Sequence, residues 1–150
     1  MKLTEYLNVE HGVILALLRH LEMLLDHKVP RKVLATAADM VAKVIDAHRD
    51  IEEMLLYPAL EEVLGPENFS IETRKHEHGS AQQIADAIHA GTVDNSQVRT
   101  FIGLLQNHIA EEIHDLFPMA EKTIPAEKLE ALTRRALDRI YDRAEVWISR

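Results

Sequence analysis

The sequence predicts an all-α fold, an up-down-up-down four-helix bundle with an additional C-terminal helix. Apolar residues recur along most of the chain with the 3.6-residue period of an amphipathic helix, and no segment alternates with the period of a strand. Only 5% of the 150 residues are aromatic, which is low for a sheet protein. The breaks between the periodic segments are short, so consecutive helices should be antiparallel neighbours.

The first two helices are bounded by residues that favour helix ends. Thr4 is a suitable N-cap for a helix that runs from Glu5 to about His27. Pro30 ends that segment and opens the next helix, because proline is tolerated in a first helical turn. Gly65-Pro66 closes the second helix, since glycine is favoured directly after a helix.

The second half of the chain is organised in the same way. Ser70 is a candidate cap for a third helix from about Ile71 to Ala90, which Gly91 terminates. The fourth helix runs from about Gln97 to Lys122. Pro125 then starts a fifth, amphipathic helix whose apolar positions are Leu129, Leu132, Ala136, Ile140, Ala144 and Trp147.

Length and composition limit the class of protein. We expect one domain over residues 1–150, with the bundle over about 4–122 and the extra helix over about 125–148. The net charge of −8 argues against nucleic acid or an anionic membrane as the main partner. The absence of cysteine excludes disulfides, iron–sulfur clusters and thiol nucleophiles. The longest apolar run, Val13 to Leu18, is too short to span a bilayer and no cleavage site follows it, so we expect a cytoplasmic protein of undetermined oligomeric state.

Two segments carry the same pattern of histidine, glutamate and proline. His48 is followed by Glu52 at four residues (HRDIEEMLLYP), and His108 by Glu112 at four residues (HIAEEIHDLFP). Each segment ends on an aromatic–proline pair. Residues four apart share a helix face, and both pairs lie on the apolar stripe of their helix. Each of these helices therefore points an imidazole and a carboxylate into the core.

Two further histidines belong to the same layer. Glu10-His11-Gly12 opens an apolar run in the first helix, and Glu77-His78-Gly79 repeats the motif in the third. With a rise of roughly 1.5 Å per residue, His11 meets His48 at one height, and His78 meets His108. Four histidines and two glutamates can thus converge on one layer of the bundle.

The other histidines have simpler interpretations. His76 competes with His78 for the inward position, but the register with Ala85 favours His78. We expect the remaining histidines to be surface or structural residues, namely His20, His27, His89 and His114.

The buried carboxylates require a positive counter-charge. An unpaired buried carboxylate costs several kcal/mol, and two that face each other also repel. No lysine or arginine lies on these stripes near the His–Glu pairs, and Arg49 points away from His48. We therefore expect a pair of metal ions between the glutamates. A ligand set of imidazoles and carboxylates suits iron, manganese or zinc.

These residues resemble the hemerythrin-like family, in particular its bacterial HHE cation-binding branch, from Thr4 to about Lys122. The resemblance implies a bundle that holds two non-haem iron ions with an oxo or hydroxo bridge, with zinc or manganese as possible substitutes. Carried over residue by residue, it assigns the metal ligands His11, His48, Glu52, His78, His108 and Glu112. His11 and His48 would then cap one ion, and His78 and His108 the other.

Two positions depart from the pattern of the family's oxygen carriers and HHE domains. Gln82 stands where the carriers place a second histidine on the third helix, and Arg49 follows His48 where many HHE domains have histidine or glutamate. The resulting site is nearly two-fold symmetric and has open positions on both metals, which argues against simple reversible oxygen carriage.

Three functions are consistent with these residues, so that both a binding protein and an enzyme remain possible. The first is a protein that binds O₂, NO or peroxide for sensing, storage or a redox stress response. The second is a di-iron enzyme with peroxidase-like or NO-reducing activity. The third is a metal-free or zinc-bound structural bundle. No catalytic residue and no pocket for an organic substrate stands out.

Overall fold

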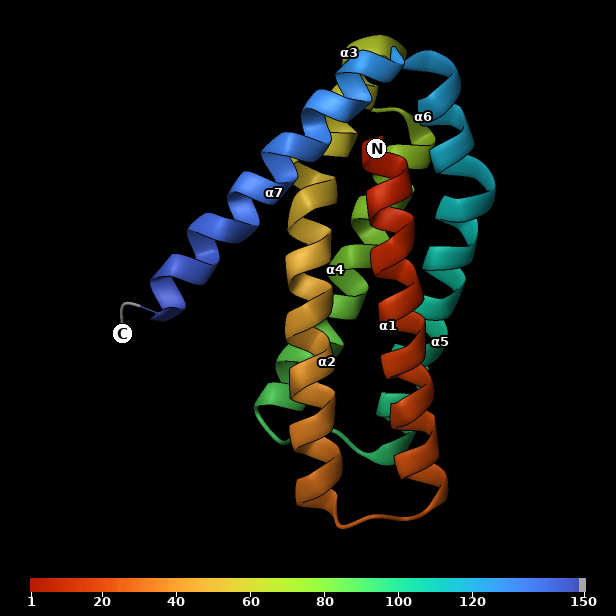
Figure 1. Ribbon diagram of the computed structural model, residues 1–150. Coiled ribbons are helices and arrows are strands. Elements are labelled where there is room, and N and C mark those ends of the chain that lie inside the picture. Colours follow the sequence, from red (N-terminus) through yellow and green to blue (C-terminus); the bar gives the residue numbers. More distant parts are fainter. Residues whose placement is uncertain (149–150) are drawn as a thin grey trace.

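The computed structural model describes the backbone of residues 1–148 and the side chains of residues 1–140. Within that part the regular secondary structure is entirely helical. Four antiparallel rods form a bundle, and a further helix crosses one end of the bundle and then diverges from it (Figure 1). The predicted fold class is therefore confirmed.

Two of the four rods are interrupted by a short π-helix. The first and third rods are the single helices α1 (Leu3–Asp26) and α4 (Phe69–His89). The second rod consists of α2 (Arg31–Ile51), η1 (Glu52–Leu56) and α3 (Tyr57–Leu64). The fourth consists of α5 (Asn95–Glu111), η2 (Glu112–Leu116) and α6 (Phe117–Thr123), and the helix outside the bundle is α7 (Ala126–Ile148).

The sequence predicts continuous second and fourth helices, but a short π-helix interrupts each of them. The backbone N–H of Tyr57 donates to the carbonyl of Glu52, five residues back, and the N–H of Phe117 donates to that of Glu112. A proline follows each time, and proline would clash with the carbonyl four residues back in a regular α-helix. The wider turn accommodates that residue without breaking the rod.

Two predicted helix caps are wrong. Helix α1 begins before Thr4, whose buried hydroxyl instead donates to Glu121 Oε1 at 2.8 Å and so joins α1 to α6. Helix α4 is capped by the side chain of Asn68, which accepts from the backbone N–H of Ser70 at 3.1 Å. Helix α1 therefore begins at Leu3 and α4 at Phe69, slightly earlier than predicted. The helix faces that point into the core are unchanged.

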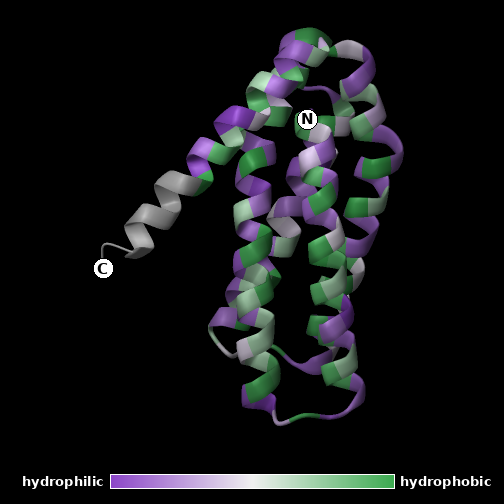
Figure 2. Ribbon diagram, viewed as in Figure 1, coloured by the Kyte–Doolittle hydropathy of each residue, from purple (hydrophilic) through white to green (hydrophobic). Residues whose placement is uncertain are grey.

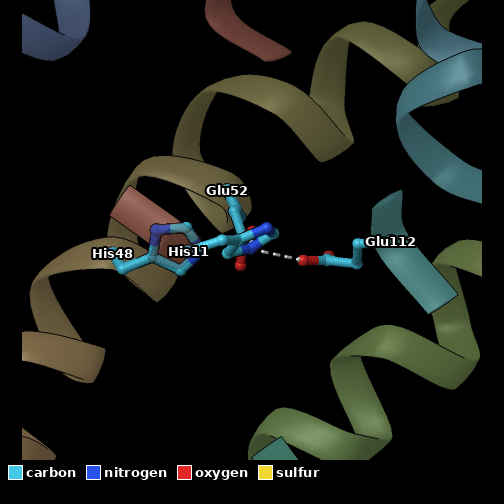
Figure 3. A group of neighbouring side chains, drawn as sticks. All are labelled: His11, His48, Glu52 and Glu112. Atoms are coloured by element: carbon cyan, nitrogen blue, oxygen red, sulfur yellow. Dashed lines mark ion pairs between the residues drawn. The ribbon is translucent and has the colours of Figure 1, made fainter. Parts of the chain in front are cut away.

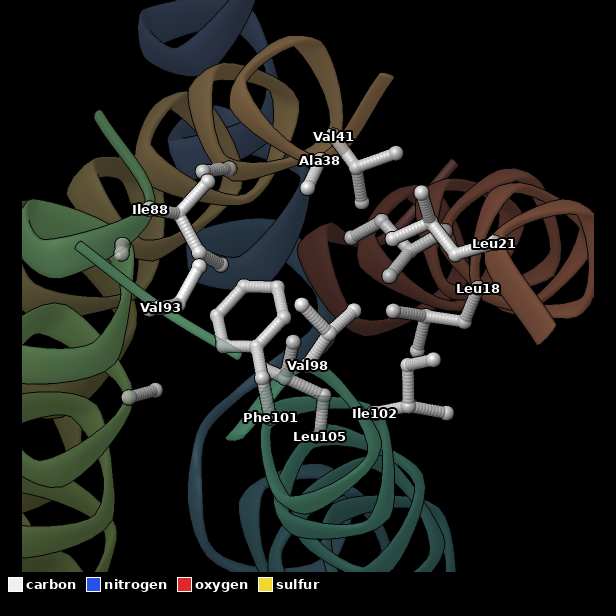
Figure 4. Close-up of a cluster of buried hydrophobic side chains, with 14 of the residues drawn as sticks. Leu18, Leu21, Ala38, Val41, Ile88, Val93, Val98, Phe101, Ile102 and Leu105 are labelled. Carbon is white, nitrogen blue, oxygen red and sulfur yellow. The ribbon is translucent and has the colours of Figure 1, made fainter. Parts of the chain in front are cut away.

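Two apolar clusters fill the bundle, one on each side of a polar layer. The rods are amphipathic, with apolar and polar residues mixed along each of them (Figure 2). The first cluster, towards the α1–α2 loop, includes residues labelled in Figure 4, namely Leu18, Leu21, Ala38, Val41, Ile88, Val93, Val98, Phe101, Ile102 and Leu105. The second cluster includes Leu3, Leu7, Leu55, Leu56, Leu60, Ile71, Leu116, Ala120 and Leu129. Burial on both sides shields the layer between them from water.

Helix α7 packs against the second cluster and forms an ion pair with α2. Leu129, Leu132 and Ala136 are buried, as predicted, whereas Ile140 is 37% exposed. The predicted apolar positions Ala144 and Trp147 lie outside the described side chains. An ion pair between Arg139 Nη2 and Asp50 Oδ2, at 2.7 Å, joins α7 to α2. Among the described residues, no helix combines the length and the apolar character needed to cross a membrane.

Candidate metal centre

The six residues predicted as metal ligands meet in the polar layer between the two clusters. None of them is more than 6% exposed. The carboxylates of Glu52 and Glu112 are fully buried, at 0% exposure, at the start of the two π-helices. The four imidazoles come one from each rod, and they are those of His11, His48, His78 and His108.

The other described histidines lie elsewhere. His76 is exposed while His78 is buried, so the choice between them is settled in favour of His78 as the inward residue. The remaining ones are all exposed, as expected, and they are His20, His27, His89 and His114.

Four of the buried groups form a first cluster of ligand atoms: His11, His48, Glu52 and Glu112 (Figure 3). His48 Nε2 lies 2.9 Å from Glu52 Oε1. His11 Nε2 lies 3.2 Å from Glu112 Oε2 and 3.8 Å from Glu52 Oε1. The two imidazole rings are tilted by 53° with their centroids 4.7 Å apart.

The same two glutamates complete a second cluster with His78 and His108. His78 Nε2 lies 3.2 Å from Glu52 Oε2, and His108 Nε2 lies 3.4 Å from Glu112 Oε2. The two Nε2 atoms are 3.0 Å apart. The rings are tilted by 58° with centroids 4.6 Å apart, so this half closely repeats the geometry of the first.

The buried ligand atoms are close to one another but poorly aligned for hydrogen bonding. Several of them make no hydrogen bond, and these include both oxygens of Glu52, Glu112 Oε2, His48 Nε2 and His11 Nε2. Within each cluster the ligand atoms lie within 4.8 Å of one another. Buried polar atoms are normally hydrogen-bonded, and lone pairs that converge on one space without a donor fit a cation. The residues present therefore fit a metal site.

Carboxylates outside the layer orient three of the four imidazoles. Glu10 lies 2.8 Å from His48 Nδ1, Glu53 lies 2.8 Å from His78 Nδ1, and Glu77 lies 2.7 Å from His108 Nδ1. A carboxylate on Nδ1 fixes the proton there and leaves Nε2 facing inward. The sequence pattern does not predict these partners, although Glu10 and Glu77 stand in the two Glu-His-Gly motifs.

The Tyr57 hydroxyl is a further polar group of the centre that the sequence analysis missed. It is fully buried and donates to Glu112 Oε1 at 3.0 Å, and it lies 3.4 Å from His78 Nε2. Phe117 occupies the equivalent place in the other half and stacks on the ring of His11. The aromatic–proline endings of the two repeats were the available signal for both residues.

Electrostatics within the layer favour charged partners. Burial alone would lower the pKa of His48, but the attraction of Glu52 and the hydrogen bond with Glu10 outweigh it and raise the pKa to about 10. Burial also lowers the pKa of His11 and His78, but the buried carboxylates of Glu52 and Glu112 outweigh it and raise the pKa of both. Burial would raise the pKa of Glu52, yet the neighbouring imidazoles hold it well below its usual value. These shifts favour the protonated forms of His11, His48 and His78 beside the carboxylates when no metal is bound.

The two residues that depart from the family pattern contact each other. Arg49 Nη1 donates to Gln82 Oε1, and Arg49 Nη2 also pairs with Asp46 Oδ1 at 3.1 Å. Together with His78 and Ala81 they line a cavity of about 20 Å³ between α2, α4 and α5. That volume is enough for one water-sized molecule beside the centre.

Comparison with known proteins gives one family. The model of a domain described as the hemerythrin HHE cation binding domain matches residues 2–120. No curated protein and no solved structure matches the chain significantly. The matched range covers most of the chain and includes all six residues that are predicted as metal ligands.

Proposed function

The chain belongs to the hemerythrin HHE cation-binding domain family, and we propose that its buried centre holds two iron ions and binds O₂, NO or peroxide. The single observation that carries this proposal is the sharing of two glutamates between two pairs of imidazoles. Glu52 turns Oε1 towards His48 and Oε2 towards His78, which is the arrangement of a carboxylate that bridges two cations.

The ligand chemistry allows iron, and the resemblance to the family selects it. Each position offers two imidazoles and two shared carboxylates, a nitrogen–oxygen set that iron, manganese and zinc accept and copper(I) does not prefer. The membership in a cation-binding family supports a metal, and the resemblance to di-iron proteins selects iron. Iron bound there would supply a change of oxidation state and open coordination positions for a small ligand.

The surrounding residues suit a small, uncharged ligand. The apolar clusters on both sides of the layer exclude bulk water and strengthen the electrostatic interactions within it. The cavity of about 20 Å³ beside His78 has room for one water-sized molecule next to the centre. Sensing, storage or a redox stress response are roles that such a site would serve.

One observation favours the second candidate, a di-iron enzyme with peroxidase-like or NO-reducing activity. The Tyr57 hydroxyl is a protic group only 3.0 Å from Glu112 and 3.4 Å from His78. Reduction of a bound oxygen or nitrogen species needs protons, and a buried hydroxyl can deliver one without admitting water. A pure binding site would not require it.

Metal analysis and absorption spectroscopy test the proposal. Protein purified without chelator should contain two irons per chain and show an oxo-to-iron absorption band in the near ultraviolet. Reversible change of that band on removal of O₂ supports a binding protein, whereas irreversible turnover with peroxide or NO supports the enzyme. Protein that folds but takes up neither iron nor another divalent metal would overturn the proposal.

A further inference from the structure

The two halves of the centre differ in how their imidazoles are supported. Three imidazoles have a carboxylate on Nδ1, as described above. His11 is the exception, because its Nδ1 is buried and has no hydrogen-bond partner among the described residues. Its ring stacks on Phe117, with the centroids 5.2 Å apart and the planes 3° from parallel, much as the ring of His78 stacks on Tyr57.

The difference has a simple origin in the sequence repeat. Counted from the histidine of each repeat, Glu53 corresponds to Ile113, and Tyr57 corresponds to Phe117. The π-helices η1 and η2 start at equivalent residues, so these side chains leave the backbone in equivalent directions. In one half a carboxylate and a hydroxyl support the layer, and in the other half two apolar side chains take their places.

The supported half is the one that contains His78 and His108. Both of its imidazoles have a carboxylate on Nδ1, from Glu53 and Glu77. In the other half only His48 has one, from Glu10. A carboxylate in this place fixes the tautomer and raises the basicity of the metal-binding nitrogen, and its loss costs about 10–100-fold in metal affinity in known sites.

We infer that the two metal positions are unequal, with the position of His78 and His108 filling first, and that Glu53 is the positioning residue that makes it so. This inference rests on the proposed function, since it presumes two metal positions. It goes beyond that function because it predicts a half-loaded protein with one ion at a defined place. The position of His11 and His48 is then the exchangeable one.

Anaerobic titration of the metal-free protein with Co²⁺ tests the inference through visible absorption. The wild type should bind two equivalents in separate steps, with the first at least about 10-fold tighter than the second. Glu53→Gln should weaken binding at the position of His78 and His108 by about 10–100-fold and leave the other position unchanged, so that the gap between the two steps closes or their order reverses. The Glu53 side chain is 41% exposed, so this variant should fold.

Glu10→Gln is the matched control, because Glu10 makes the same contact with His48 in the other half. It should weaken the second step and spare the first. A general loss of stability would move both steps in both variants, so the separation of the two effects identifies the positions. Two equal steps in the wild type, or the same response in both variants, would overturn the inference while leaving a two-metal centre intact. Failure to bind Co²⁺ and Fe²⁺ at all would overturn the proposed function as well.

Discussion

At the scale of single residues, the centre depends on two carboxylates that have no access to water. Glu52 and Glu112 are at 0% exposure, and the polar groups beside them within the described residues are imidazoles and the Tyr57 hydroxyl. An isolated buried carboxylate is strongly unfavourable, so these residues need either protonated imidazoles or bound cations. Glu52 and Glu112 therefore determine both how much metal the centre binds and how many protons its imidazoles carry without metal.

Removal of either carboxylate charge should empty the centre. Glu52→Gln and Glu112→Gln should each lose most of the bound metal, because each carboxylate serves both clusters. The matched controls are His20→Ala and His89→Ala, which alter exposed histidines and should retain the wild-type content. Elemental analysis of the purified variants measures the result, and equal metal retention in all four would contradict the assignment of the glutamates.

Metal binding should release protons. The pKa of His48 is raised to about 10, so this imidazole is protonated at neutral pH when no metal is bound. A metal binds only the deprotonated nitrogen, and protons compete more strongly as the pH falls. The apparent affinity should therefore rise steadily from about pH 6 to pH 8. Calorimetric titration in two buffers of different ionisation enthalpy measures the protons released, and a result of zero would contradict this account.

At the scale of elements, the π-helices place the functional groups. In a regular α-helix, residues five apart are roughly 140° from sharing a face, but in η1 the wider turn brings Tyr57 onto the face of Glu52. Glu112 and Phe117 have the same relation in η2. Each π-helix thus contributes its first residue, and the residue directly after it, to the layer.

The sequence predicted the fold and the inward residues because periodicity and i, i+4 spacing are local properties. It did not predict the π-helices, since their only local signal is Pro58 and Pro118, which also fit the first turn of a new helix. It did not find Glu53 as a partner of His78, because that contact joins α4 to η1 across the bundle. An exposed glutamate in a chain with 25 acidic residues carries no signal of its own.

Two glycines, one after the end of α4 and one inside α5, test the described backbone conformation through their effect on stability. Gly91 follows α4 with a φ of 69°, where a side chain is strained, so Gly91→Ala should destabilise the protein by about 1–2 kcal/mol. Gly103 lies inside α5, and a Cβ there would meet nothing within 4 Å. Gly103→Ala should therefore stabilise the protein by about 0.5–1 kcal/mol. Urea unfolding midpoints measure both, and effects of the same sign would contradict the described ends of α4.

At the scale of the whole molecule, the polar layer divides the core. Apolar side chains pack into one cluster on each side of the layer. Each of the four rods contributes one imidazole to the layer itself. Because the candidate ligands come from every rod, metal bound as proposed would link the four rods at one level. Without metal, the rods are joined at this level by hydrogen bonds and ion pairs such as those of Tyr57 with Glu112 and of His78 with Glu52.

Metal should consequently raise the unfolding temperature. A ligand at about 1,000 times its dissociation constant stabilises the native state by about 4 kcal/mol. For a chain of this size that corresponds to roughly 10 °C in the melting temperature. Differential scanning calorimetry with and without a chelator measures the shift. Glu52→Gln is the control and should show no response to the chelator, and an unchanged melting temperature in the wild type would contradict a metal link between the rods.

The central claim is that two cations lie between Glu52 and Glu112, each bordered by one pair of imidazoles. Anomalous X-ray diffraction from crystals, recorded at the iron absorption edge, tests it most directly. Two anomalous peaks are expected in the polar layer, one beside His11 and His48 and one beside His78 and His108. A layer filled by ordered water or by rearranged side chains, with no anomalous peak after incubation with ferrous iron, would contradict it.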